Sequence, residues 1–233
     1  MVNNGKEKNF QKVKEYLMKG SECVREGDFR NAIVNFDKAI RLNPNLAGAW
    51  SDRGAAWGQV GEFDKAIADL SEAIRLDPDD WLAWFNRGFA WDGKGDIDNA
   101  IADYSEAIRL NPNDANAWNN RGNAWRRKKE INKSVLDLDE AIRLNPNDAN
   151  AWNNRGLSMA VKGELDKAVA DFDEAIRLDS GNTDAWISRG FARTQKREYN
   201  KAIADFDEAL RQDSSNQYAI RGRKIALSLK STK

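Results

Sequence analysis

The chain has 233 residues, of which 41% are hydrophobic and 32% are charged. Lys+Arg and Asp+Glu both number 37, and this balance gives no general attraction to nucleic acid or to an anionic membrane. Histidine is absent and Cys23 is the single cysteine, which excludes an intramolecular disulfide and a zinc site built from Cys and His. Because the sequence also shows no nucleophile–base pair, phosphate loop or metal constellation, we expect no metal, no cofactor and no enzyme activity.

The N-terminal stretch MVNNGKEKNFQKVKEYLMKG (residues 1–20) has no apolar core of the kind a secretory signal needs. No later run approaches the roughly 18 consecutive apolar residues of a membrane span. We therefore expect a soluble, cytoplasmic protein without a membrane partner.

Three kinds of residue recur along the chain with a spacing of 34. They are the prolines Pro44, Pro78, Pro112 and Pro146, the tryptophans Trp50, Trp84, Trp118, Trp152 and Trp186, and the Arg-Gly pairs that begin at Arg53, Arg87, Arg121, Arg155 and Arg189. A period shared by three kinds of residue predicts a repeat architecture. It gives an N-terminal segment at 1–12, six repeats at 13–46, 47–80, 81–114, 115–148, 149–182 and 183–216, and a C-terminal capping helix at 217–233.

The repeat at 47–80 shows what one unit contains. Trp50, Gly54 and Trp57 share one face of a predicted helix, at i, i+4 and i+7. Gly61 suits a tight turn. A second apolar stripe follows and ends before Pro78, since the residue before proline is disfavoured in a helix. Each repeat is therefore predicted to be two antiparallel helices, with the i, i+7 pairs Trp50 and Trp57, Trp84 and Trp91, and Trp118 and Trp125 in the core.

Trp50, Gly54, Trp57, Gly61 and Pro78, together with the alanines of the second helix, resemble the signature of the tetratricopeptide repeat (TPR) family. The resemblance covers about 200 residues. It implies an all-α fold, a right-handed superhelical solenoid of antiparallel helix pairs. It also implies a non-catalytic protein–protein interaction scaffold.

The repeated arginines lie where the family carries an apolar residue, and an unpaired guanidinium would be costly to bury. A repeated aspartate in the second helix offers a partner. We therefore predict a structural ion-pair ladder made of Arg53, Arg87, Arg121, Arg155 and Arg189 with Asp69, Asp103, Asp137, Asp171 and Asp205.

The resemblance also implies a concave groove, lined by the first helices, that holds a peptide or helix of a partner protein. The groove residues expected by transfer are Phe85, Asn86, Phe89, Asn116, Asn119, Asn120, Asn123, Arg126, Arg127, Asn150, Asn153, Asn154, Leu157 and Phe191. Asn86, Asn120 and Asn154 hold one repeat position and are expected to form an amide ladder along the backbone of an extended, partly apolar segment. Arg126 and Arg127 predict one acidic point in that segment.

Three other functions are alternatives to the binding of a partner peptide in the groove. The lysine clamp of chaperone-binding TPR domains is missing, because the first clamp position holds residues such as Phe85 and Asn119. Self-assembly of the array into homo-oligomers is the main alternative. A nucleic-acid site at residues 126–129 (RRKK) is disfavoured by the zero net charge, so no nucleic-acid partner is expected.

Overall fold

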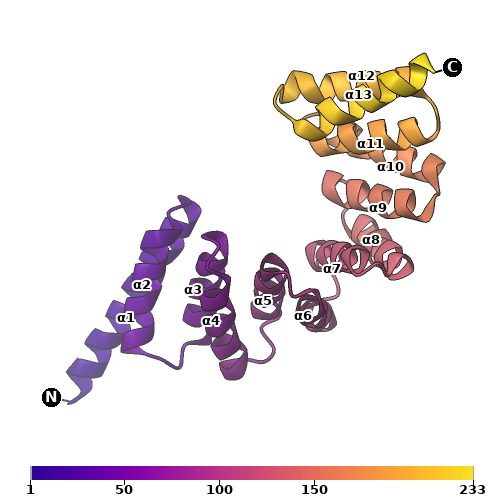
Figure 1. Ribbon diagram of the computed structural model, residues 1–233. Helices are drawn as coiled ribbons and strands as arrows, with labels where there is room; N and C mark the ends of the chain where they lie inside the picture. Colours follow the sequence, from indigo (N-terminus) through magenta and orange to yellow (C-terminus); the bar gives the residue numbers. More distant parts are fainter. Residues whose placement is uncertain (1, 233) are drawn as a thin grey trace. The chain divides into compact units, whose positions relative to one another are not determined.

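The computed structural model describes the backbone of residues 2–232 and the side chains of residues 7–232, and over that range it contains thirteen α-helices and no strand (Figure 1). The chain forms two compact units, Met1–Asn113 and Asp114–Lys233. The first unit holds α1 (Val2–Arg25), α2 (Phe29–Leu42), α3 (Ala47–Gln59), α4 (Phe63–Leu76), α5 (Trp81–Lys94) and α6 (Ile97–Leu110). The second holds α7 (Ala115–Arg127), α8 (Ile131–Leu144), α9 (Ala149–Lys162), α10 (Leu165–Leu178), α11 (Thr183–Gln195), α12 (Tyr199–Gln212) and α13 (Gln217–Ser231). The predicted all-α fold of paired helices is confirmed.

The predicted boundary between residues 12 and 13 falls inside α1, which is continuous across it. From α1 onward, odd-numbered helices are the first of each pair and even-numbered helices are the second. The last helix, α13, has the place of a first helix and packs on α11 and α12.

The turn between the two helices of a pair always passes through a left-handed residue. Glycine occupies it in four repeats, at Gly27, Gly61, Gly95 and Gly163. Lys129 (φ 67°) and Arg197 (φ 62°) occupy the same position in the other two. A side chain disfavours this conformation, so these two repeats keep the turn at an energetic cost.

Close contact within a pair depends on a glycine in the first helix. At Gly54 an added Cβ would lie 2.6 Å from Cγ of Leu70, and at Gly156 it would lie 2.6 Å from Cε1 of Phe172. Neither contact is sterically allowed, so the glycine lets the large residue of the second helix reach the backbone of the first. Leu70 and Phe172 are fully buried there.

The repeated arginines and aspartates are joined across the five helix pairs from α3–α4 to α11–α12. Arg53 donates from Nε and Nη2 to the two carboxylate oxygens of Asp69, at 2.7 and 2.8 Å. These hydrogen bonds hold the pKa of Arg53 above its ordinary value. The same pairing joins Arg87 to Asp103, Arg121 to Asp137, Arg155 to Asp171 and Arg189 to Asp205. These are the ten residues expected to form the ladder.

The ladder also reaches the preceding repeat. Nη1 of Arg53 donates to Asp37 on α2 at 2.9 Å, and Nη1 of Arg155 donates to Asp139 on α8 at 2.7 Å. Ser71 accepts the equivalent bond from Arg87. Each such arginine therefore ties its own helix pair to the second helix of the repeat before it.

The repeated tryptophans complete the junction, and they are half-buried. The guanidinium carbon of Arg53 lies 4.8 Å from the centre of the Trp50 ring. The indole N–H of Trp50 donates to the carbonyl oxygen of Pro44 at 2.8 Å, in the turn between repeats. Trp84, Trp152 and Trp186 make the same two contacts.

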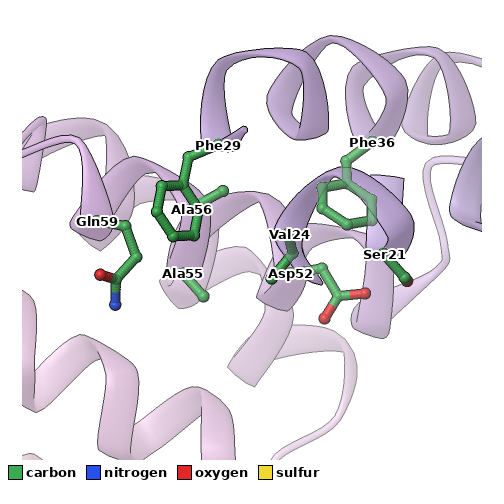
Figure 2. Close-up of a pocket in the computed structure, with 8 residues that line it drawn as sticks. All are labelled: Ser21, Val24, Phe29, Phe36, Asp52, Ala55, Ala56 and Gln59. Carbon is green, nitrogen blue, oxygen red and sulfur yellow. The ribbon is translucent and has the colours of Figure 1, made fainter. Parts of the chain in front are cut away.

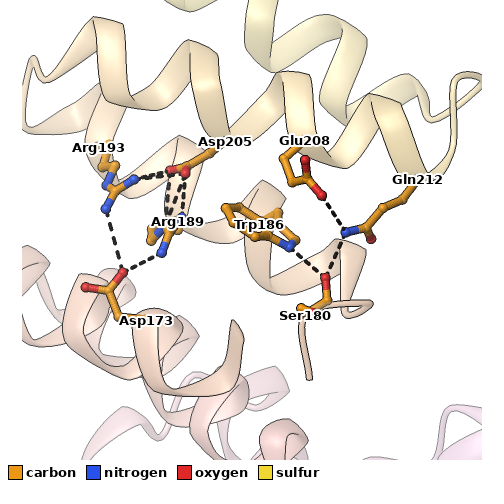
Figure 3. A network of polar contacts seen from close by, with 8 residues as sticks. All are labelled: Asp173, Ser180, Trp186, Arg189, Arg193, Asp205, Glu208 and Gln212. Carbon is orange, nitrogen blue, oxygen red and sulfur yellow. Dashed lines mark hydrogen bonds and ion pairs between the residues drawn. The ribbon is translucent and has the colours of Figure 1, made fainter. Parts of the chain in front are cut away.

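The junction of α10, α11 and α12 departs from the pattern in an informative way (Figure 3). Arg193 replaces the usual aromatic residue and donates to Asp205, which thus receives Arg189 and Arg193 together. Ser180 stands where the first four repeats carry proline. Its carbonyl oxygen accepts from Trp186 at 3.0 Å and from Gln212 at 2.8 Å, so the turn is still held.

Replacing Lys129 by glycine should raise the free energy of unfolding by roughly 1 kcal/mol, because it removes the left-handed strain. Urea unfolding followed by circular dichroism measures this. Lys128→Gly is the control, because Lys128 has an ordinary φ of −76° and its replacement should be destabilising. Equal effects of the two variants would contradict the assignment of strain.

Asp171→Asn should lower the free energy of unfolding by about 3 kcal/mol, because it leaves a largely buried guanidinium without its bidentate partner. Glu174→Gln removes a carboxylate from the same helix, but Glu174 pairs with Arg177 near solvent and its loss should have a much smaller effect. The comparison is made by urea unfolding, and equal losses would show that the ladder does not stabilise the junction.

Candidate functional site

Each unit has a hollow between consecutive first helices. The α1–α3 hollow has a volume of about 390 Å³ and is lined by Ser21, Val24, Phe29, Phe36, Asp52, Ala55, Ala56 and Gln59. The α9–α11 hollow has a volume of about 250 Å³ and is lined by Leu157, Ala160, Val161, Phe172, Ser188, Phe191, Ala192 and Gln195. When positions are counted from the first residue of each 34-residue repeat, the residues that line the two hollows hold nearly the same positions. The repeat therefore builds the same kind of hollow at both places.

In the second unit, two residues of the expected groove meet in the α9–α11 hollow. Leu157 comes from α9 and Phe191 from α11, and both are half-buried. The Phe191 ring packs edge-on against Phe206, with ring centres 5.1 Å apart, which fixes its direction. Val161, at the edge of the hollow, is 64% exposed. The hollow is therefore apolar, open and free of charge.

Five of the seven asparagines of α7 and α9 divide into three groups. Asn154 donates to the amide oxygen of Asn119 at 3.0 Å, which links the two first helices. Asn120 is half-buried. Asn116 and Asn150 are exposed in the first turns of their helices, where their backbone N–H groups bond to the capping Asp114 and Asp148.

Asn153 lies inside the packing and not on the open face. It is 8% exposed, and its amide oxygen has no hydrogen-bond partner within the described residues. Ser51 and Ile187 hold the same repeat position and are buried too. This position faces the neighbouring helices, so Asn153 could reach a ligand only if the packing opened.

Arg126 differs from the ladder arginines because its bonded partner is a neutral amide and not a carboxylate. It donates from Nη2 to the amide oxygen of Asn123 at 2.7 Å, while its Nε is buried without a partner. Burial, reinforced by the charge of Arg127, lowers the pKa of Arg126. Arg126 has the repeat position of Val24 and Ala160, which line the two hollows. A half-buried cation that is bonded to a neutral amide thus lies at a hollow position.

The expected groove residues of the first unit are Phe85, Asn86 and Phe89. Phe85 packs against Tyr104 with ring centres 5.8 Å apart, Asn86 is half-buried, and Phe89 is 41% exposed. Asn86 belongs to the first unit, whereas Asn120 and Asn154 belong to the second. The amide ladder through all three stays a prediction.

Sequence reasoning did not find the α1–α3 hollow. Its acidic residue, Asp52, has the repeat position of Asn86, Asn120 and Asn154. The hollow could have been predicted by applying the family's groove positions to the first two repeats as well. The position within the repeat, and not the residue type, identifies its lining residues.

The described part of the chain offers neither a metal site nor a membrane-spanning helix. From residue 7 to residue 232, no three side chains of His, Cys, Asp or Glu gather in a way that could hold a metal ion. Over the described backbone, no helix is both long enough and apolar enough to cross a membrane.

Paired helices on a 34-residue period, with hollows between the first helices, define a helical-repeat scaffold for protein–protein interaction. Family profiles described as TPR repeat match residues 59–91 and 94–128, and profiles described as tetratricopeptide repeat match residues 14–46, 115–148 and 149–182. The chain belongs to the tetratricopeptide repeat proteins.

Individual relatives agree with this family. An uncharacterized protein of Methanocaldococcus jannaschii, MJ0572, is 38% identical over 50 residues, which are 22% of this chain and 58% of that protein. The structure of YrrB, described as a TPR protein with an unusual peptide-binding site, is 24% identical with a TM-score of 0.66 and covers 81% of this chain and 97% of YrrB. The structure of MamA is 25% identical with a TM-score of 0.65 and covers 73% of this chain and 93% of MamA.

Proposed function

We propose that the chain is a non-catalytic scaffold that binds an extended segment of a partner protein along the first helices α7, α9 and α11. The observation that carries this proposal is Arg126, a half-buried guanidinium with no acidic partner among the described residues. The ladder arginines are each bonded to a carboxylate, so an arginine left with a neutral amide is an exception. A carboxylate of the partner would satisfy it.

The neighbouring groups suit the rest of an extended segment. Asn119 and Asn154 already bond to each other, and each amide keeps further hydrogen-bonding capacity for a peptide backbone. The α9–α11 hollow, with Leu157 and Phe191, suits one apolar side chain. The proposed partner therefore carries an acidic residue and, separated along the segment, an apolar one.

The fold likeness to YrrB lends no residue a role here, since at 24% identity the likeness concerns the fold alone. Self-assembly end to end is less favoured. α13 carries four basic residues and no acidic one, and α1 carries six basic residues against three acidic ones. Stacking one end on the other would bring two basic helices together.

A nucleic-acid site at residues 126–129 is also less favoured. Arg126 is half-buried and bonded to Asn123, so its guanidinium is not freely presented to a phosphate backbone.

Peptides selected from a random phage-displayed library on the full chain should contain an acidic residue and an apolar residue. Isothermal titration calorimetry of the synthetic peptides should show roughly tenfold weaker binding to Arg126→Gln, because a charge-assisted hydrogen bond is lost. The variant Asn120→Ala/Asn154→Ala should also bind more weakly.

Arg143→Gln is the control, because Arg143 is an exposed arginine on α8 that pairs with Glu140 and its loss should leave peptide affinity unchanged. Circular dichroism checks that all variants fold. The proposal fails if selected peptides bind the Arg126 and asparagine variants as tightly as the unchanged chain. It also fails if no peptide is selected and light scattering shows concentration-dependent oligomers, which would favour self-assembly.

A further inference from the structure

The α1–α3 hollow is a pocket in the first unit that is lined by residues of α1, α2 and α3 (Figure 2). Phe29 and Phe36 of α2, Val24 of α1 and Ala56 of α3 give it apolar walls. Phe36 and Ala56 are almost fully buried, so the wall behind the opening is fixed by the core. The polar residues that line the hollow are Ser21, Asp52 and Gln59.

Asp52 is the one charged residue that lines this hollow. No hydrogen bond or ion pair of its carboxylate is found within residues 7–232, although Asp52 lies on the same helix as the fully paired Arg53. Asp52 is an exposed residue, but the walls of the hollow partly desolvate its carboxyl, which raises the pKa of Asp52, and the charge of Asp80 raises this pKa further. Asp80 itself caps α5 by accepting from the backbone N–H of Leu82. The hollow therefore presents an acidic group that lacks a cation.

The equivalent hollow in the second unit shows what is special here. Ser188 stands where the first hollow has Asp52, and Phe191 stands where it has Ala55. The α9–α11 hollow is consequently neutral and smaller, about 250 Å³ against about 390 Å³. One repeat position thus sets the charge of the hollow, and another sets its size.

We propose that the α1–α3 hollow binds a partner segment in which a lysine or arginine adjoins a bulky apolar residue. The apolar side chain enters between Phe29 and Phe36, and the cation meets the carboxylate of Asp52. This inference rests on the proposed scaffold role, but it assigns a different site and the opposite charge preference.

The other ligand classes fit less well. A purely apolar segment would bury Asp52 further without a partner, which is unfavourable. An acidic segment would be repelled by Asp52 and Asp80. Gln59 lies two helical turns from Asp52 on α3, about 10 Å along the axis, and its amide can bond to the backbone of an extended segment.

The test uses two peptides, acetyl-Gly-Ser-Leu-Arg-Ser-Gly-amide and its analogue with citrulline in place of arginine, which is neutral and nearly isosteric. Each is titrated into the ¹⁵N-labelled full chain, and backbone amide shifts report where it binds. We expect shifts at Ser21, Asp52 and Gln59, and roughly fivefold tighter binding of the arginine peptide.

Asp52→Asn, which introduces the asparagine of the equivalent positions, should reduce the affinity for the arginine peptide to that for the citrulline peptide. Ala55→Phe introduces the residue found at Phe89 and Phe191, and it should weaken both peptides by filling the hollow. Asp64→Asn is the control for general charge effects, because Asp64 is exposed and pairs with Lys94 outside the hollow.

Equal affinity for the two peptides, an unchanged affinity in Asp52→Asn, or no shift at these amides at millimolar peptide would overturn the inference. The outcome is separable from the proposed function. Selected acidic peptides that depend on Arg126 would uphold the scaffold role even if the α1–α3 hollow bound nothing.

Discussion

Within each unit, the structure depends on arginines that join their own helix pair to the second helix of the repeat before. Arg155, for example, is bonded to Asp171 in its own helix pair and to Asp139 in the repeat before, and its guanidinium lies over the ring of Trp152. Burying such a group gives little net stability by itself, but leaving it unpaired is costly. A wrong register between helices would separate the charges, so the ladder specifies one arrangement of neighbouring repeats.

The ladder leaves the hollows free for recognition. The ladder arginines occupy the seventh position of the first helices, and the ladder aspartates lie on the second helices. The hollows are lined by residues at other positions, such as Asp52, Ala55 and Val161. Because different residues hold the fold together and line the open face, a change in a hollow does not break the ladder. This separation explains how neutral and acidic hollows coexist in one chain.

The helix pairs could be predicted from the sequence because the period was repeated six times. Within the repeat, glycine marked the tight turn between the two helices and proline marked the end of the second helix. The pairing of Arg53 with Asp69 followed from the cost of burying a lone charge. Trp50 was predicted as core, but it is half-buried, because its indole N–H bonds to the carbonyl oxygen of Pro44 and its ring stacks on the guanidinium of Arg53. The inward position of Asn153 could not be predicted, because periodicity gives the face of a helix but not which neighbour covers it.

The ladder has a consequence for how such a chain can change in length. A repeat such as 47–80 or 115–148 brings an arginine, the aspartate that this arginine pairs with, and an acceptor, Ser71 or Asp139, for the arginine of the next repeat. Duplication or deletion of one whole 34-residue unit therefore creates a junction in which every charge still has a partner. An insertion of another length within the helices would leave a buried arginine facing the wrong residue, so growth by whole repeats is the change this chemistry tolerates.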